Sequence, residues 1–311
     1  MSVAPFPNGL SSFGNVLHGS GAVMDVGNVY WVNNSPTSTK GTEMTKRYGK
    51  VVYSDGTRML QTSVANAITA CKGGRNDYII AGTGAYTLTT LATLSGKSSI
   101  HLIGQNGFGR GVGSAGAALL QQTGAFAVVA MEAYCELAGF QIINLTGYSA
   151  VTVAANIWRP SIHHNTFHTV AGSAINIVDA TGALACSYGN ISQNRFATWV
   201  GGNMTSCINV GTATGVDIIE NYISHYNGTC DYGITQAGAQ CLVKDNVVMN
   251  SGSGGVVTVA VNIHEYSSAV DNRLAVDAGK GLAGGTAANS FVGNKDGATG
   301  TGNGQASNLE T

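Results

Sequence analysis

A short pattern of apolar and polar residues recurs through the middle of the chain. In each copy a β-prone pair is followed by a variable residue, an asparagine, a second variable residue and an apolar residue. Successive asparagines of the pattern follow one another at similar intervals, and Gly139 stands one such interval before the first of them. A regular period of this kind indicates repeated structural units. The asparagines are Asn165, Asn194, Asn221, Asn246, Asn272 and, in a less complete copy, Asn294.

The recurring position predicts a fixed corner of the backbone. Asparagine and glycine adopt the left-handed conformation more readily than other residues, so Gly139 and the asparagines are expected to have positive φ. Asparagines stacked from one unit to the next are also expected to form a ladder of amide hydrogen bonds. We therefore assign Gly139, Asn165, Asn194, Asn221, Asn246 and Asn272 a structural role.

The segments between the corners predict the fold class. Short β-prone runs flank each corner, without hairpin signals or helical periods between them. Such a chain is expected to wind into a solenoid whose coils pair as parallel strands. The sequence therefore predicts an all-β protein, a single-stranded parallel β-helix of about nine coils, right-handed by the crossover preference.

The two ends of the chain differ from its middle. Residues 57–71 have apolar positions at helical spacing, which predicts an amphipathic capping helix with Thr57 as its N-cap. A cap is needed because the first coil of a solenoid exposes core and unpaired strand edges. We expect an N-terminal arm over residues 1–56, with one strand around Trp31, a β-helix over 57–295 and a flexible tail over 296–311.

The segment after the expected cap carries a family resemblance. Asp77, Ile79, Gly84 and Tyr86 match the form D-x-I-x-V-x-x-G-x-Y. This form is similar to the first coil of the pectate-lyase-like β-helix superfamily, and the resemblance covers residues 57–295. It implies the fold alone, although some members of the superfamily cleave polysaccharides with carboxylates on one outer sheet.

Three carboxylates are the candidates for such chemistry. Glu220, Asp245 and Asp271 each directly precede a corner asparagine. Coils about 4.8 Å apart would bring neighbouring carboxylates near the roughly 5–5.5 Å of a retaining glycosidase pair. Residues beside a turn are also polar simply because they face water. Catalysis, a metal site and a solvated corner therefore all remain open.

Other side chains that could carry chemistry are few. His163, His164 and His168 form a cluster with no acidic residue within ten positions, and the six cysteines show no CxxC spacing. No metal and no cofactor are predicted. Four aromatic residues are expected either to line a sugar-binding face or to serve as packing and interface anchors: Trp158, Trp199, Tyr222 and Tyr226.

Composition narrows the class of partner. The chain has 15 basic and 16 acidic residues, and only 10% of its 311 residues are charged. A net charge of −1 gives no field for nucleic acid or an anionic membrane. The first lysine or arginine of the chain is Lys40, so a basic secretory n-region is not evident. We expect no nucleic-acid or membrane partner and no export by the secretory route.

A weakly charged β-helix with an arm and a small-residue tail resembles virion proteins of tailed bacteriophages. The resemblance implies a capsid decoration or knob protein, a homotrimer assembled in the host cytoplasm, with capsid or other virion proteins and host polysaccharide as partners. A tailspike depolymerase is the alternative, and a secreted lyase or adhesin is a third. Attachment to the particle is expected through apolar and basic residues of the arm: Phe6, Leu10, Phe13, Trp31, Lys46 and Arg47.

Overall fold

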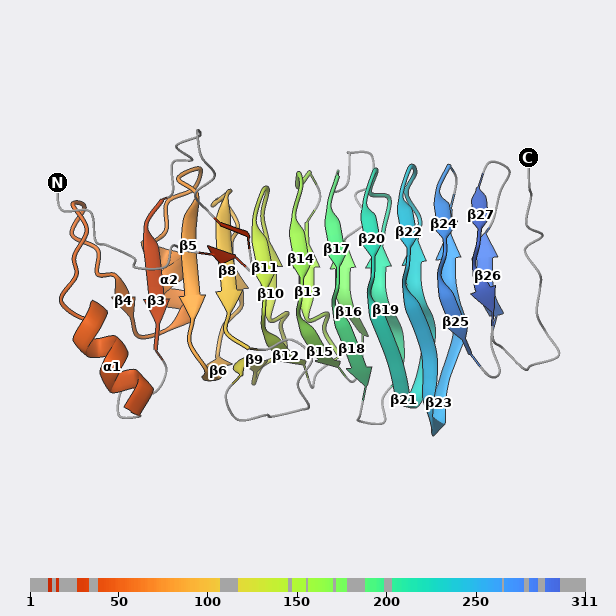
Figure 1. Ribbon diagram of the computed structural model, residues 1–311, viewed down its shortest axis with the longest axis horizontal. Helices are drawn as coiled ribbons and strands as arrows, with labels where there is room; N and C mark the ends of the chain where they lie inside the picture. Colours follow the sequence, from red (N-terminus) through yellow and green to blue (C-terminus); the bar gives the residue numbers. More distant parts are fainter. Residues whose placement is uncertain are drawn as a thin grey trace.

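The chain folds as a parallel β-solenoid of about eight turns with two short helices, which confirms the predicted fold class. Figure 1 shows the coils stacked along the long axis, with the N-terminal strands at one end and β27 at the other. The computed structural model describes residues 11–12, 15–16, 27–33, 39–106, 117–144, 147–154, 156–169, 172–177, 188–198, 203–264, 266–276, 280–284 and 289–296.

Each coil contributes strands to three faces. The first face is an 11-stranded sheet in which all the pairs are parallel. Its strands are β3 (Val29–Val32), β4 (Leu60–Gln61), β5 (Asp77–Ala81), β8 (Ile100–Gly104), β11 (Glu136–Ala138), β14 (Ser161–His163), β17 (Asn190–Ser192), β20 (Asp217–Ile219), β22 (Leu242–Lys244), β24 (Ser268–Val270) and β27 (Ser290–Val292).

The second and third faces form one 15-stranded sheet, because two long strands run through both. These are β21 (Tyr222–Gln236) and β23 (Val247–Ile263). The second face also contains β6 (Gly84–Leu88), β9 (Ala118–Gln122), β12 (Gln141–Asn144), β15 (Thr166–Thr169), β18 (Arg195–Thr198), β25 (Arg273–Ala275) and β28 (Lys295–Asp296). The third contains β7 (Ala92–Thr93), β10 (Val129–Met131), β13 (Val151–Val153), β16 (Gly172–Ile177), β19 (Met204–Val210) and β26 (Lys280–Gly284). Apart from these sheets, β1 (Ser11–Ser12) and β2 (Asn15–Val16) form an antiparallel pair.

The core is a stack of aliphatic side chains in register. On the first face the middle residue of each short strand points inward, and Leu137, Ile162, Ile191 and Ile218 follow one another in successive coils. Each of them is at most 1% exposed. Burial of such a side chain stabilises a fold by about 1.5–3 kcal/mol, so the apolar position in each repeat holds the coils together.

The corner asparagines form a continuous buried ladder. Both the backbone N–H and Nδ2 of Asn165 donate to Oδ1 of Asn194, at 3.1 and 3.2 Å, and Nδ2 also donates to the Leu137 carbonyl of the preceding coil at 2.9 Å. The same donor pattern runs through the rest of the ladder: Asn194 to Asn221, Asn221 to Asn246, Asn246 to Asn272 and Asn272 to Asn294. Each asparagine from Asn165 to Asn272 therefore links three coils.

The expectation of positive φ at the asparagines was wrong by one residue. The left-handed residue is the one before each asparagine, so the asparagine itself can turn its amide into the core. Gly139 aligns with His164, and Phe140, whose N–H donates to Asn165 Oδ1 at 3.1 Å, takes the ladder position in that coil. Gly139 is thus a left-handed corner residue and not a ladder member. The left-handed residues are Gly139, His164, Gln193, Glu220, Asp245, Asp271 and Gly293, with φ from 53° to 75°.

This placement predicts opposite effects of two substitutions at one site. Asp245 has φ of 54° and is exposed, with Lys244 as its nearest ionic partner at 3.6 Å. Asp245→Gly should leave the free energy of unfolding unchanged or raise it by up to about 1 kcal/mol, because glycine adopts this conformation without strain. Asp245→Val should lower it by about 1 kcal/mol or more. Urea unfolding checks both, and a valine variant as stable as the glycine variant would contradict the assignment.

The capping helix is shorter than predicted. Helix α2 covers Val64–Ala70, and its N-cap is Ser63, whose hydroxyl accepts from the Asn66 N–H at 3.1 Å. Thr57 is not the N-cap. The apolar residues at 59 and 60 belong instead to the segment that enters β4, which explains why their spacing resembled a longer helix. A second helix, α1 (Thr39–Tyr48), lies within the expected arm.

The strand expected around Trp31 lies inside the solenoid. β3 is hydrogen-bonded between β4 and β5 in the first face. The β-helix therefore begins before residue 57, and residues 27–33 belong to its first face and not to a separate arm.

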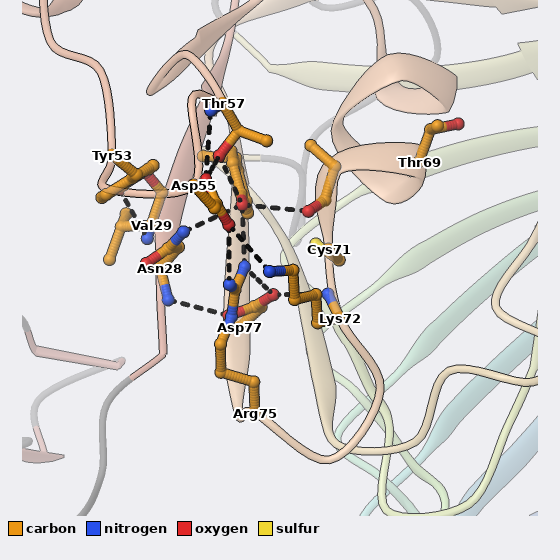
Figure 2. A network of polar contacts seen from close by, with 12 residues as sticks. Asn28, Val29, Tyr53, Asp55, Thr57, Thr69, Cys71, Lys72, Arg75 and Asp77 are labelled. Carbon is orange, nitrogen blue, oxygen red and sulfur yellow. Dashed lines mark hydrogen bonds and ion pairs between the residues drawn. The ribbon is translucent and has the colours of Figure 1, made fainter.

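A polar network fastens this N-terminal end (Figure 2). The fully buried Asp77 carboxylate accepts two hydrogen bonds from Arg75, at 2.7 and 2.8 Å, and one each from the backbone N–H groups of Asn28 and Lys72, both at 2.8 Å. A buried carboxylate is tolerated when its oxygens are satisfied in this way. Asp77, part of the family-like motif, therefore joins β3, β5 and the end of α2.

Candidate functional site: an aromatic row at a second corner

A second left-handed corner precedes the strands of the first face. Its residues lie six positions before each ladder position and have φ from 50° to 66°. Non-glycine residues rarely adopt this conformation, yet most residues in this column are not glycine. Its members in the part of the chain that the structure describes are Tyr134, Arg159, Tyr188, Gly215, Gln240 and Tyr266, and Asn76 and Ser99 occupy the same place in the earlier coils.

Three large aromatic side chains lie at this corner in consecutive coils. We call Tyr134, Trp158 and Tyr188 the aromatic row. They are 51%, 42% and 56% exposed. The Tyr134 N–H donates to the Trp158 carbonyl at 2.7 Å, and the rings of Trp158 and Tyr188 have centroids 6.2 Å apart at an angle of 35°. The three exposed residues therefore lie in successive coils, over a length of about 10 Å for two coil steps, and the rings of Trp158 and Tyr188 are neighbours.

The next coil leaves room for the last ring of the row. A Cβ atom at Gly215 would lie 2.9 Å from Cδ1 of Tyr188, which is too close for an ordinary contact. Gly215 therefore lets the Tyr188 ring lie against the backbone of the following coil. This contact and the left-handed backbone restrict where the ring can lie.

An arginine shares the column with the row. Arg159 lies between Tyr134 and Tyr188 in the stack, directly after Trp158, and is exposed. Within the residues that the structure describes, no carboxylate or carbonyl accepts a hydrogen bond from its guanidinium. A guanidinium beside exposed rings can bind a carboxylate in a bidentate manner.

The aromatic residues singled out in the sequence do not lie together. Trp158 belongs to the row, whereas Tyr222 lies on β21 of the second face, with the Arg195 guanidinium 5.5 Å from its ring centroid. Tyr226 is also on β21, and Trp199 lies outside the described residues. The row was missed because its members are recognisable only by their place six or seven positions before the ladder, not by closeness in the sequence.

The three candidate carboxylates do form one column. Glu220, Asp245 and Asp271 lie at the first corner in successive coils, all exposed and all with left-handed backbone. Glu220 Oε2 accepts a hydrogen bond from Nε2 of Gln193 at 2.7 Å, and Asp245 lies 3.6 Å from Lys244. The left-handed conformation accounts for the short polar side chains of Asp245 and Asp271 without any catalytic role.

The structure keeps two histidines of the sequence cluster in contact and separates the third. His163 and His164 are in contact, with their Nδ1 atoms 2.9 Å apart, but His168 is buried on β15 with its Nδ1 3.2 Å from the Ala197 carbonyl. His163 instead pairs with Glu136 of the preceding coil, at 2.7 Å, and the other oxygen of Glu136 lies 2.5 Å from His101. This His–Glu–His bridge spans β8, β11 and β14.

The bridge controls the ionisation of its carboxyl group. Burial alone would raise the pKa of Glu136, but hydrogen bonds from His101 and His163 outweigh it and lower the pKa to about 2. Burial and the charge of His163 lower the pKa of His164. In the described part of the chain, no group of three or more histidine, cysteine, aspartate or glutamate residues is placed to hold a metal ion.

The expected attachment residues have different surroundings. Trp31 is half-buried and stacks on Tyr48 of α1, with ring centroids 5.0 Å apart and an angle of 3°. Lys46 and Arg47 are exposed in the last turn of α1, and Lys46 lies 3.4 Å from Glu43. The three remaining attachment residues lie outside the described ranges: Phe6, Leu10 and Phe13.

Comparisons with known proteins found similarity in structure alone. No family model and no curated protein matches it. Among the described helices, none is long and apolar enough to cross a membrane. An alginate lyase from Paenibacillus sp. str. FPU-7 is similar in structure, with a TM-score of 0.49 and 14% identity, over 76% of this chain and 93% of the lyase. ORF18 of Geobacillus virus E2 gives a TM-score of 0.26 and 12% identity, over 75% of this chain and 56% of that protein.

Proposed function

We propose that this chain is a structural protein of a tailed-bacteriophage virion, a capsid decoration or knob, and that its β-helix presents the aromatic row to a glycan of the host surface. The observation that supports this most is the row itself, with one exposed ring in each of three consecutive coils. Aromatic rings stack on the apolar faces of sugar rings. A linear glycan lying along the solenoid would meet Tyr134, Trp158 and Tyr188 in turn.

The fold suits such a role because it fixes the rings before the ligand arrives. The rows of backbone hydrogen bonds on either side of the corner and the asparagine ladder hold neighbouring coils in register. Tyrosine and tryptophan offer large contact areas for few rotatable bonds. Binding therefore costs little conformational entropy at this surface.

Attachment to the particle belongs to the same proposal. The helix α1 lies at the N-terminal end of the solenoid (Figure 1) and carries the exposed Lys46 and Arg47. We propose that this end faces the shell and that a homotrimer projects the other coils outward. Antibody labelling of the parent particle tests the location, and label on the tail instead of the shell would favour the tailspike alternative.

The test of glycan binding uses the purified chain and arrays of capsular and cell-wall oligosaccharides. Trp158→Ala should weaken binding at least tenfold, about 1.4 kcal/mol, because the central ring of the row is lost. Tyr148→Ala is the matched control, since Tyr148 is 50% exposed but lies outside the row. Equal binding by wild type and Trp158→Ala, or equal losses in both variants, would contradict the proposal.

The alternative function is cleavage of host polysaccharide, and the exposed column of Glu220, Asp245 and Asp271 is the observation that favours it. The same incubations are examined for new reducing ends or unsaturated products. If the column is catalytic, products should form with wild type and disappear when Glu220→Gln, Asp245→Asn and Asp271→Asn are combined. Binding without products in any sample would leave only the non-enzymatic role.

A further inference from the structure

We infer that copies of this chain associate side by side, with their solenoid axes parallel, through the edge between the first and second faces in the C-terminal half of the solenoid. The inference rests on the proposed homotrimer and names its contact surface, which we call the charged edge. The charged edge consists of an acidic column at the first corner, Glu220, Asp245 and Asp271, and a cationic column on the second face, Arg195, Arg273 and Lys295.

The acidic column is fixed by the backbone. The N–H groups of Glu220, Asp245 and Asp271 donate to carbonyls of the next coil at 3.0, 3.1 and 2.9 Å, and all three side chains are exposed. Carboxylates stacked at the coil spacing of about 4.8 Å repel one another. Within the described ranges, Lys244 is the one cation found within 4.0 Å of the column, at 3.6 Å from Asp245. The column therefore keeps negative charge that a neighbouring copy could neutralise.

The cationic column runs along the outer side of the second face. One register position holds, in five successive coils, Arg195, Tyr222, Val247, Arg273 and Lys295. The three cations are exposed, and none of them forms an ion pair with a carboxylate among the residues that the structure describes. The second face therefore presents positive charge beside the acidic corner.

Apolar side chains accompany the charges. Tyr222 is 36% exposed, and its ring centroid lies 5.5 Å from the Arg195 guanidinium. Val292, whose carbonyl accepts from the Asp271 N–H, is 51% exposed. Val247 is half-buried. Exposed ion pairs alone contribute little to binding, whereas interfaces between proteins combine buried apolar surface with a polar rim. The charged edge provides both kinds of surface.

The order of the two columns favours parallel copies. Across an axis parallel to the solenoid, the acidic column of one copy faces the cationic column of the next. Without axial shift, Asp271 lies level with Arg273 of the next copy, and Glu220 lies one coil from its Arg195. One coil is about 4.8 Å, which long side chains can span. An antiparallel pair would instead place each column against its own copy, and like charges disfavour that arrangement.

The matching heights also favour a closed assembly. Head-to-tail contacts close into a ring when the rotation closes on itself, and they otherwise extend into a filament. Because the opposite charges already match without translation along the axis, a ring of three copies satisfies every acidic column with a cationic column. The charged edge therefore suits the proposed homotrimer.

The experiment measures the mass of the purified full-length chain in solution by sedimentation velocity. Wild type should sediment as a trimer, and its dissociation constant should rise with salt. Glu220→Lys combined with Asp271→Lys should raise the dissociation constant about a hundredfold or more, and so should Arg195→Glu combined with Arg273→Glu. A chain with all four substitutions should associate as wild type does, because its two columns have exchanged signs.

Two controls separate the effect of charge from that of folding. Gln193 occupies the same left-handed corner one coil earlier, so the position accepts a long side chain. Circular dichroism and melting of each variant check that its coils are intact. Glu43→Lys combined with Asp231→Lys changes the net charge as much as the acidic reversals do. Both residues are exposed on α1 and on the third-face part of β21, away from the charged edge, so this variant should remain a trimer.

The outcomes separate the inference from the proposed function. A trimer that withstands both pairs of reversals would overturn the inference and leave the homotrimer in place, and so would a folded four-substitution chain that fails to associate. A monomeric wild type would overturn both. A dimer that dissociates on reversal and reforms in the four-substitution chain would support the charged edge and overturn the homotrimer. Glycan binding is measured separately, and its absence would overturn that part of the proposed function without affecting the charged edge.

Discussion

Replacing Asn221 by aspartate should lower the free energy of unfolding at neutral pH by about 3 kcal/mol or more. Asn221 is 1% exposed. Its Nδ2 group donates to the Ile191 carbonyl at 2.9 Å and to Oδ1 of Asn246 at 3.0 Å. Aspartate removes these donors and places a buried negative charge against the same acceptor oxygens.

The pH dependence of this variant identifies the cause. Acceptor oxygens and burial both favour the protonated carboxyl, so the pKa of the new aspartate should rise in the folded state above its ordinary value of about 3.9. An acid whose folded pKa is raised costs stability as pH rises through the window between the two values. The deficit of Asn221→Asp should therefore be smallest near pH 4 and grow toward neutrality, whereas Asn221→Leu should show a deficit that changes little with pH.

Asn209→Asp is the matched control for the ladder. Asn209 also pairs with an asparagine of the neighbouring coil, Asn176 at 2.7 Å, but the pair is only half-buried. Its substitution should cost less than about 1 kcal/mol. Denaturant midpoints over a series of pH values measure all three variants. Similar losses of stability for Asn209→Asp and Asn221→Asp would mean that burial of the ladder does not increase its contribution to the free energy of unfolding.

The period of the sequence was sufficient to predict the solenoid and the ladder but not the exact corner. Gly139 precedes Asn165 by an interval within the range of the repeat, so spacing alone aligned the two. The strand register aligns Gly139 with His164 instead, one position before Asn165. Spacing between coils varies from one repeat to the next, and only hydrogen-bond register distinguishes a residue that sets the turn from the one that follows it.

The candidate site was less predictable because its contacts join different coils. Glu136 lies 35 positions after His101 and 27 positions before His163, because the three residues belong to successive coils. A search for an acidic partner near His163 in the sequence therefore could not find Glu136. The aromatic row has the same character, because Tyr134, Trp158 and Tyr188 come together only when the coils are stacked.

The second large effect is expected at Glu136, whose contribution to the stability of the fold should be lost in acid. The pKa of this carboxyl is lowered from 4.5 to about 2 in the folded chain, because burial, which raises it, is outweighed by the bonds from His101 and His163. A depressed carboxyl pKa stabilises the fold above the unfolded value and loses that contribution as pH falls through the folded value. Wild type should therefore lose on the order of 3 kcal/mol between about pH 4.5 and pH 2.

Glu136→Gln tests this assignment because it removes the titrating group. The variant should be less stable than wild type at pH 6 and should lack the loss between pH 4.5 and 2. Asp217 gives a control of opposite sign. It lies in the same outward column of the first face, three coils further on, and burial raises its pKa. Asp217→Asn should therefore stabilise the chain at neutral pH, with a gain that shrinks in acid. If Glu136→Gln lost as much stability in acid as wild type, the titrating carboxyl groups would have to lie outside the bridge. The hydrogen bonds from His101 and His163 would then only position β11 between its two neighbouring strands.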